Sequence, residues 1–209
     1  GLLIPLGFLL FWEILSATGY WSSHLLPSPA QVFKATFSLA DSGLLWKHIL
    51  VSLARVIGGF LLACVFAIPM AVFLGMRPKL WPWFSPILNF FRHTPPLALI
   101  PILILWLGIG EATKLSIIIL ASFFPIFLNS ESGIRNADFR LIEVGKSLDY
   151  STKDIFRKII FPSALPAIAL GMRLGMGYSW LAFIGAEMIA ASSGLGYLIL
   201  YAEQMFRSD

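Results

Sequence analysis

The sequence predicts an all-α, polytopic membrane protein. Of its 209 residues, 58% are hydrophobic and only 12% are charged, and the mean hydropathy is +0.83. A soluble domain needs a larger polar share to cover its surface, so this composition is typical of an integral membrane protein. The apolar residues also lie in long blocks, and a helix needs about 20 such residues to cross a bilayer.

These blocks predict about five spans. They lie at residues 1–15, 49–76, 84–107, 113–128 and 164–191. The first block is short for a span, so we expect part of it to precede Gly1. A Leu-Pro-Ser-Pro turn that ends at Pro29 predicts an amphipathic helix near the interface over 29–39. A Ser-Ser-Gly-Leu-Gly break after the fifth span predicts a short amphipathic helix over 197–206.

The block at 84–107 is predicted to be broken. Pro95, Pro96 and Pro101 lack the amide proton that a helix needs, so they bend or interrupt it. Irregular backbone at membrane depth is tolerated where it faces protein or a water-filled cavity, so this region is a candidate wall of a translocation path. The alternative is a proline kink that serves only packing. Arg92 and His93 also have an alternative, which is to extend to the cytoplasmic surface.

Ionisable side chains within the other spans are costly, and they are usually paired or line a cavity. Arg55 lies near one end of the second span, where snorkelling to the interface is one interpretation. Arg173 lies two or three turns into the fifth span and has two interpretations, an ion pair near the inner surface or a direct functional role. Glu187 would repel an anion unless it is paired or protonated, so we expect it to have a gate or structural role.

The longest polar passage, residues 135–162, predicts a helical hairpin. Apolar residues recur at helical spacing on both sides of a turn at 149–151. Ser151 is placed to cap the second helix, Asp154 stands at the capping-box position, and Pro162 is expected to close that helix. A hairpin of mixed charge between two spans suggests a surface that meets another protein.

The distribution of Lys and Arg predicts that this hairpin is cytoplasmic. With the 77–83 and 130–162 loops inside, eight basic residues lie inside and four lie in the opposite loops. The eight are Arg77, Lys79, Arg135, Arg140, Lys146, Lys153, Arg157 and Lys158, and the four are Lys34, Lys47, Lys114 and Arg207.

The hairpin resembles the EAA loop of permease subunits in binding-protein-dependent ABC importers. That loop reads Glu-Ala-Ala, then Gly four residues after the second Ala, then Ile-x-Leu-Pro ten residues beyond the Gly. Glu143, Ile159 and Pro162 are in register with it, and the departures are Val144, Gly145, Asp149 and Phe161. Since Asp tolerates a left-handed turn better than most residues, we expect the turn to form without glycine. An ordinary cytoplasmic loop is the alternative.

The resemblance extends over residues 26–209. It implies a type I ABC importer permease bundle, one transmembrane domain over 1–209 with the coupling hairpin at about 135–162, and a sixth span after Asp209. It also implies a second permease copy in a homodimer, cytoplasmic ATPase subunits that bind ATP and Mg, a periplasmic or lipid-anchored binding protein, and the lipids of a bacterial inner membrane. The residues expected to contact the ATPase are Glu143, Gly145, Leu148, Asp149, Tyr150 and Ser151.

Two stretches, 92–111 and 186–199, look like permeases for sulfonates, taurine and nitrate, most of all those of the aliphatic-sulfonate branch. The implied solute is a small anion, and the alternative is another small organic solute such as a pyrimidine vitamin precursor. Candidate path residues are Arg92, Thr94, Pro95, Pro96, Arg173, Glu187, Ser192 and Ser193, with Arg55 as a further basic partner for an anion.

Two other classes of protein are alternatives to a permease of this family. A secondary transporter needs ion-coupling acids within its spans, and the sequence offers only Glu13 and Glu187 there. A structural membrane subunit without a path of its own has no need of a broken third span. The chain contains no GxxxxGK[ST] or HExxH motif and no Cys/His cluster, so we expect no nucleotide site, metal site, nucleic-acid partner or catalytic residue in it.

Overall fold

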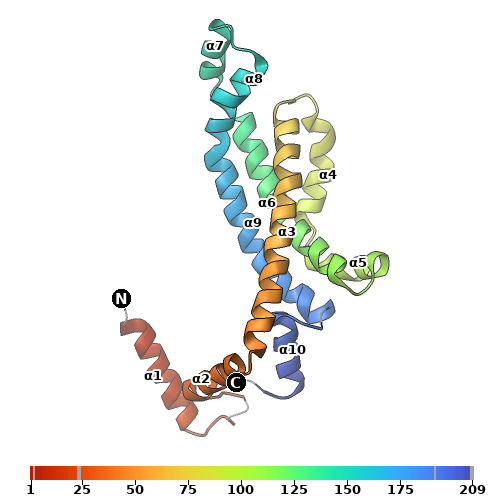
Figure 1. Cartoon of the computed structure of the whole chain (residues 1–209). Helices are drawn as coiled ribbons and strands as arrows, with labels where there is room; N and C mark the ends of the chain where they lie inside the picture. Colours follow the sequence, from red (N-terminus) through yellow and green to blue (C-terminus); the bar gives the residue numbers. More distant parts are fainter. Residues whose placement is uncertain (2, 23–24, 191, 208–209) are drawn as a thin grey trace. The chain divides into compact units, whose positions relative to one another are not determined.

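The computed structural model describes residues 1, 3–22, 25–190 and 192–207, and every regular element in these ranges is helical (Figure 1). The chain forms two compact units. The first, Gly1–Leu53 with Glu187–Asp209, contains α1 (Leu3–Ala17), α2 (Pro29–Asp41), the start of α3 (Leu44–Gly75) and α10 (Leu195–Gln204). The second is Ala54–Ala186. Two helices, α3 and α9, have residues in both units. The single domain expected over 1–209 stays a prediction.

The first unit confirms the helices predicted after Pro29 and near the end of the chain. Ser28 and Gln31 form a capping box at the start of α2, because the Ser28 hydroxyl accepts from the Gln31 amide at 3.3 Å and the Gln31 side chain accepts from the Ser28 amide at 2.9 Å. The Trp12 indole of α1 donates to the Pro27 carbonyl at 3.0 Å, which fixes the link into α2.

The second unit contains the remaining helices. They are α4 (Trp81–His93), η1 (Pro96–Leu99), α5 (Ile100–Leu107), α6 (Glu111–Arg135), α7 (Phe139–Ser147), α8 (Thr152–Ile155), the π-helical η2 (Phe156–Ile160) and α9 (Phe161–Ala190). Three described helices are long and apolar enough to cross a membrane, and a fourth span results if the broken pair of α4 and α5 counts as one. The predicted first span corresponds to α1, a shorter apolar helix.

The predicted break in the third block is confirmed. Helices α4 and α5 meet at 90°, and Thr94 and Pro95 between them have extended backbone. The Thr94 hydroxyl donates to the Phe90 carbonyl at 3.1 Å, which occupies one acceptor at the end of α4.

The prediction that Pro162 closes the second hairpin helix is wrong. Helical backbone continues from Thr152 to Ile189 over 38 residues. Just before the proline, the Phe161 amide donates to the carbonyl of Phe156, five residues back. The wider π turn gives room to the prolyl ring, which in a regular helix would crowd the carbonyl four residues back, so the hairpin and the fifth span form one continuous helix.

The fourth span is also longer than predicted, and this changes the count of acids within spans. Helix α6 continues to Arg135, so it includes Glu131, whose side chain is only 2% exposed. The inference that Glu13 and Glu187 are the only such acids is therefore wrong. Glu131 has Arg135 as an ion-pair partner at 3.4 Å, one helical turn further on.

Small residues bring the long helices of the second unit close together. An ideal Cβ on Gly59 of α3 would lie 2.5 Å from the Ile118 side chain of α6, and one on Gly175 of α9 would lie 2.7 Å from Ile126 of α6. Gly171 is similarly close to α6, but Gly177 has no atom within 4 Å and is not part of this contact. Close approach through small residues is the usual way in which helices pack in membranes.

Gly59→Val is expected to destabilise the second unit by about 1–3 kcal/mol, because the added methyls overpack the contact with Ile118. Gly58→Val is the matched control, since an added Cβ at Gly58 meets nothing within 4 Å. The measurement is the thermal midpoint of each variant in detergent, and equal midpoints for the two would contradict the packing argument.

Candidate functional sites

The turn of the hairpin has the geometry that the sequence predicts. Asp149 adopts the left-handed conformation, with φ 58°. The Tyr150 amide donates to the Gly145 carbonyl at 3.0 Å and the Asp149 amide donates to the Lys146 carbonyl at 3.0 Å, which is a Schellman ending of α7. Ser151 caps α8, since its hydroxyl accepts from the Asp154 amide at 3.2 Å and donates to the Asp154 carboxylate at 2.6 Å.

The two arms of the hairpin pack through Gly145. This residue is buried, and an ideal Cβ on it would lie 2.7 Å from Ile159 and 3.4 Å from Ile155. Tyr150 is half-buried in the same place, with the Lys158 ammonium 4.4 Å from the centre of its ring. Gly145 and Tyr150 therefore shape the hairpin from inside and offer a partner little surface.

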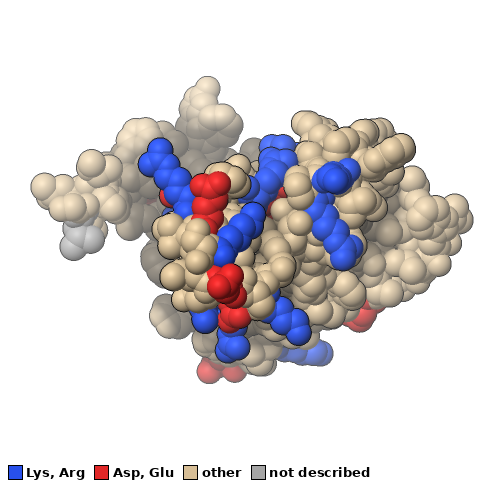
Figure 2. Space-filling model, turned by 90° about the horizontal axis from the view of Figure 1, so that it is seen from above, with Lys and Arg blue, Asp and Glu red and all other residues tan. Residues whose placement is uncertain are grey.

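The other predicted coupling residues lie on the outside of the hairpin. Glu143, Leu148, Asp149 and Ser151 are exposed, and Leu148 exposes 60% of its surface. Further exposed apolar side chains on α7 were not singled out from the sequence, and these are Phe139, Leu141 and Val144. In the sequence, the sign that these side chains share a surface with charges is their alternation with Arg140, Glu143 and Lys146. Viewed from the hairpin end, the surface shows Lys and Arg side chains with carboxylates among them (Figure 2).

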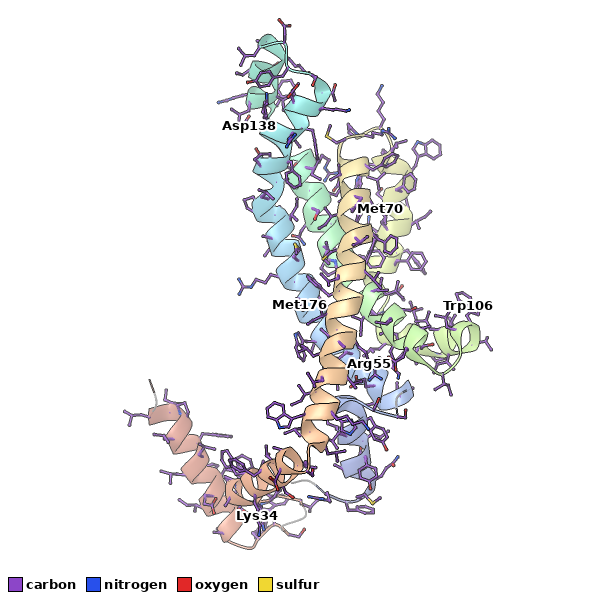
Figure 3. The ribbon with its side chains drawn as sticks, in the orientation of Figure 1. Lys34, Arg55, Met70, Trp106, Asp138 and Met176 are labelled. Carbon is purple, nitrogen blue, oxygen red and sulfur yellow. The ribbon has the colours of Figure 1, made fainter. Side chains whose placement is uncertain are left out.

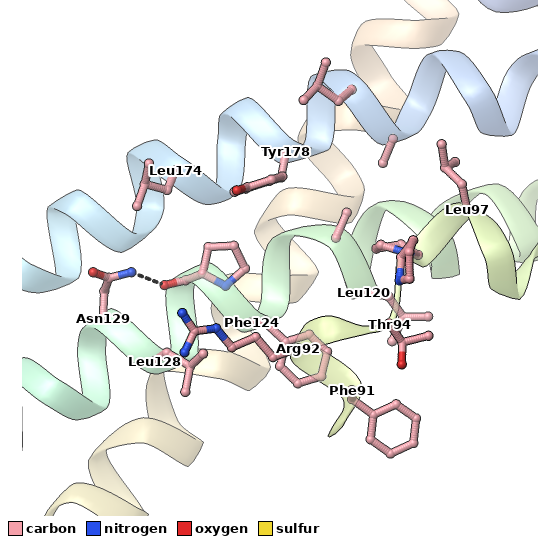
Figure 4. A pocket seen from close by; sticks show the side chains of 16 residues that line it. Phe91, Arg92, Thr94, Leu97, Leu120, Phe124, Leu128, Asn129, Leu174 and Tyr178 are labelled. Atoms are coloured by element: carbon pink, nitrogen blue, oxygen red, sulfur yellow. Dashed lines mark hydrogen bonds between the residues drawn. The ribbon is translucent and has the colours of Figure 1, made fainter. Parts of the chain in front are cut away.

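The break between α4 and α5 opens into a pocket of about 400 Å³ within the second unit. Four of the predicted path residues line it, namely Arg92, Thr94, Pro95 and Pro96. Helices α6 and α9 form the facing walls (Figure 4). The prolines were therefore a valid signal for an irregular wall.

Two polar residues of this pocket were missed in the sequence. Tyr178 lies on α9, and Asn129 lies on α6 just beyond the predicted end of the fourth span. The Asn129 amide donates to the Pro125 carbonyl at 2.8 Å. A polar side chain within an apolar block, or directly after one, was the only signal available for either. The sequence does not show which side of a helix faces the pocket.

The pocket has a simple electrostatic character. Of its 16 lining residues, Arg92 alone carries a formal charge, and no carboxylate is among them. Arg173 is exposed on α9 and does not line this pocket. Ser192 is exposed and Ser193 is half-buried, and both belong to the first unit, as does Glu187.

Arg55 does not reach outward to the interface. It is 7% exposed, and its guanidinium makes two hydrogen bonds to Glu111, at 2.7 and 2.6 Å. The Lys114 ammonium contacts the same carboxylate at 2.7 Å (Arg55 is labelled in Figure 3). A bidentate arginine–carboxylate pair is strong and directional, so Arg55 is held at the start of α6.

Glu187 is at the centre of a buried polar cluster in the first unit. It is 1% exposed, and the Ser52 hydroxyl lies 2.9 and 2.8 Å from its two carboxylate oxygens. The Gly196 amide donates to the same carboxylate at 2.9 Å, and the Leu195 amide donates to Ser52 at 2.8 Å.

His48 completes this cluster, because its Nδ1 accepts from the Gly194 amide at 2.8 Å and its ring stacks on Tyr197. An accepting Nδ1 requires the neutral imidazole with its proton on Nε2. The contacts hold the glycine-rich break before α10 against the start of α3. Of the two roles expected for Glu187, they favour the structural one.

Comparison with known proteins agrees with this architecture. The family model for inner membrane components of binding-protein-dependent transport systems matches residues 59–209. Aliphatic sulfonates transport permease proteins SsuC from Bacillus subtilis and Escherichia coli are 35% and 38% identical to this chain, over 100% and 99% of it and 76% and 78% of their own lengths. The taurine transport system permease protein TauC of Escherichia coli is 32% identical over 95% of the chain and 74% of its own length.

Proposed function

Since this chain belongs to the family of binding-protein-dependent transport system inner membrane components, we propose that it is the permease subunit of an ATP-driven importer of a small anion. The observation that carries the proposal is the hairpin, whose exposed tip combines Leu148 with the charged side chains of Glu143 and Asp149. An exposed apolar residue among charges is a suitable contact for a protein partner. The partner we propose is a cytoplasmic ATPase that binds ATP and Mg.

The continuous helix from Thr152 to Ile189 supports a mechanism for the coupling. Its first turns belong to the hairpin, and further along it carries Leu174 and Tyr178 into the pocket. A displacement of the docked hairpin when two ATPase subunits close on ATP would therefore be transmitted along a rigid element to the pocket wall. Nucleotide then biases an equilibrium between inward-open and outward-open states.

The anion assignment has separate support. Arg92 is the only charged residue lining the pocket, so the pocket favours negative solutes. The relatives compared above are named as transport permeases for aliphatic sulfonates and for taurine. The proposed solute is thus an aliphatic sulfonate, taurine or nitrate. A homodimer of permease subunits and a soluble or lipid-anchored binding protein complete the proposed importer.

ATP hydrolysis by the complex reconstituted in lipid is the test. We expect a severalfold stimulation by a binding protein loaded with one of these three solutes and none by the empty binding protein. If no loaded binding protein stimulates a stable permease–ATPase complex, the anion assignment is wrong. If the permease binds no ATPase at all, the importer proposal is wrong.

A further inference from the structure

The pocket at the α4–α5 break has a charged end and a long apolar wall. We propose that it is a solute subsite within the permease itself, selective for an alkanesulfonate with an unbranched tail over taurine and nitrate. Its sulfonate group would bind Arg92 and Tyr178, and its alkyl chain would lie along the apolar side chains that α6 and α9 contribute to the pocket. The inference rests on the proposed import function and narrows its solute.

Arg92 provides the anion contact. Its side chain points along the pocket toward Leu128 and Asn129, and Tyr178 faces the same space from α9 (Figure 4). Arg92 forms no ion pair with any described residue, so its donors are available. The planar guanidinium presents several N–H groups in a fork that matches the oxygens of an oxyanion.

The other polar groups of the pocket add few donors. The Thr94 hydroxyl proton is used on the Phe90 carbonyl, and the Asn129 amide already donates one proton to the Pro125 carbonyl. The Tyr178 hydroxyl and the second Asn129 proton remain for a ligand. This small set suits one compact anionic group, because the rest of the surface has nothing to offer a polar solute.

The remaining wall is apolar. Twelve of the 16 lining residues carry no polar side-chain group, and they include Leu120 and Phe124 on α6 and Leu174 and Leu181 on α9. A volume of about 400 Å³ lies in the usual range for small-molecule sites, which is roughly 300–1,000 Å³. Each methylene buried against such a wall should strengthen binding about threefold to fourfold.

The same wall argues against the two other solutes, taurine and nitrate. Taurine carries an ammonium group, and no carboxylate lines the pocket to pair with it, so that charge would lie against apolar side chains without a partner. Nitrate has no tail and would leave the apolar wall unused. Propane-1-sulfonate is the matched comparison for taurine, since it places a methyl group where taurine has its ammonium.

The experiment measures the binding of labelled hexane-1-sulfonate to the permease–ATPase complex in phosphatidylcholine nanodiscs. The binding protein is left out, so any selectivity belongs to the permease. Alkanesulfonates of increasing length, taurine and nitrate serve as competitors. We expect affinity to rise about threefold to fourfold per methylene until the pocket is filled. Taurine should bind at least about tenfold more weakly than propane-1-sulfonate.

Arg92→Gln should weaken the binding of hexane-1-sulfonate at least about tenfold. The dependence of affinity on chain length should remain, because only the head-group contact is lost. Tyr178→Phe should weaken this binding by a smaller factor. Arg77→Gln is the control, since Arg77 is a basic residue of the same unit that does not line the pocket. This variant should bind hexane-1-sulfonate with the affinity of the parent.

Three results would overturn the subsite. The first two are equal affinities for taurine and propane-1-sulfonate, and unchanged binding in Arg92→Gln. The third is loss of ligand binding when the nanodiscs that hold the complex contain phosphatidylglycerol, which would assign the pocket to a lipid. Each of them leaves the importer proposal intact if ATP hydrolysis is still stimulated by a loaded binding protein. Failure of the permease to bind any ATPase would instead overturn the importer proposal, and the subsite would fall with it.

Discussion

Gly194→Ala is expected to abolish the fold of the first unit. Gly194 has φ 117° and ψ 174°, a backbone conformation that is essentially restricted to glycine. A Cβ there would also overlap the Glu187 carboxylate. The turn can relieve both problems only by withdrawing, and this would break the hydrogen bond from the Gly194 amide to His48 and leave buried polar groups without partners. Backbone strain and desolvation together should cost at least about 3 kcal/mol.

Fluorescence-detected size-exclusion chromatography after heating in detergent would measure this loss. Gly177→Ala is the matched control, because Gly177 lies in α9 and a Cβ there meets nothing within 4 Å. Ser52→Ala should give an intermediate loss of about 1–3 kcal/mol, since it removes one partner of Glu187 and one of the Leu195 amide. A Gly194→Ala variant as stable as the parent would show that the cluster does not hold the turn.

Local signals explain why the hairpin turn was predictable. The Schellman ending at Asp149 and the cap at Ser151 depend on residues within a few positions of each other. The same holds for the break at Pro95. In these places the side-chain chemistry alone restricts the backbone, so the sequence is sufficient.

Long-range contacts explain what was not predictable. The Ser52–Glu187 hydrogen bonds join residues 135 positions apart, and no local pattern links a serine of α3 to a glutamate of α9. The role of Pro162 depends on the π turn before it, because a proline near a helix end either closes the helix or starts the next one. The Tyr178 side of α9 faces the pocket only because Gly171 and Gly175 set the contact of α9 with α6.

Leu148→Glu is expected to weaken the association with the ATPase strongly without affecting the fold of the permease. Leu148 exposes 60% of its surface at the end of α7, so in this chain it stabilises little by burial. In a docked complex, the introduced carboxylate would be buried without a partner in the contact proposed for Leu148, which is costly. We expect the Kd for the ATPase to rise at least about thirtyfold, which corresponds to about 2 kcal/mol. Binding to immobilised permease in nanodiscs measures it.

Phe139→Glu tests whether the effect belongs to the tip. Phe139 begins α7, exposes 62% of its surface and undergoes the same change from apolar to acidic, yet it lies outside the proposed contact at 143–151. It should therefore bind the ATPase within about threefold of the parent, which is the small change usual for residues at the edge of an interface. If both variants lose binding equally, the docking surface extends along the whole of α7. If neither does, the hairpin tip is not the coupling contact, and the continuous helix from Thr152 transmits no motion from a partner.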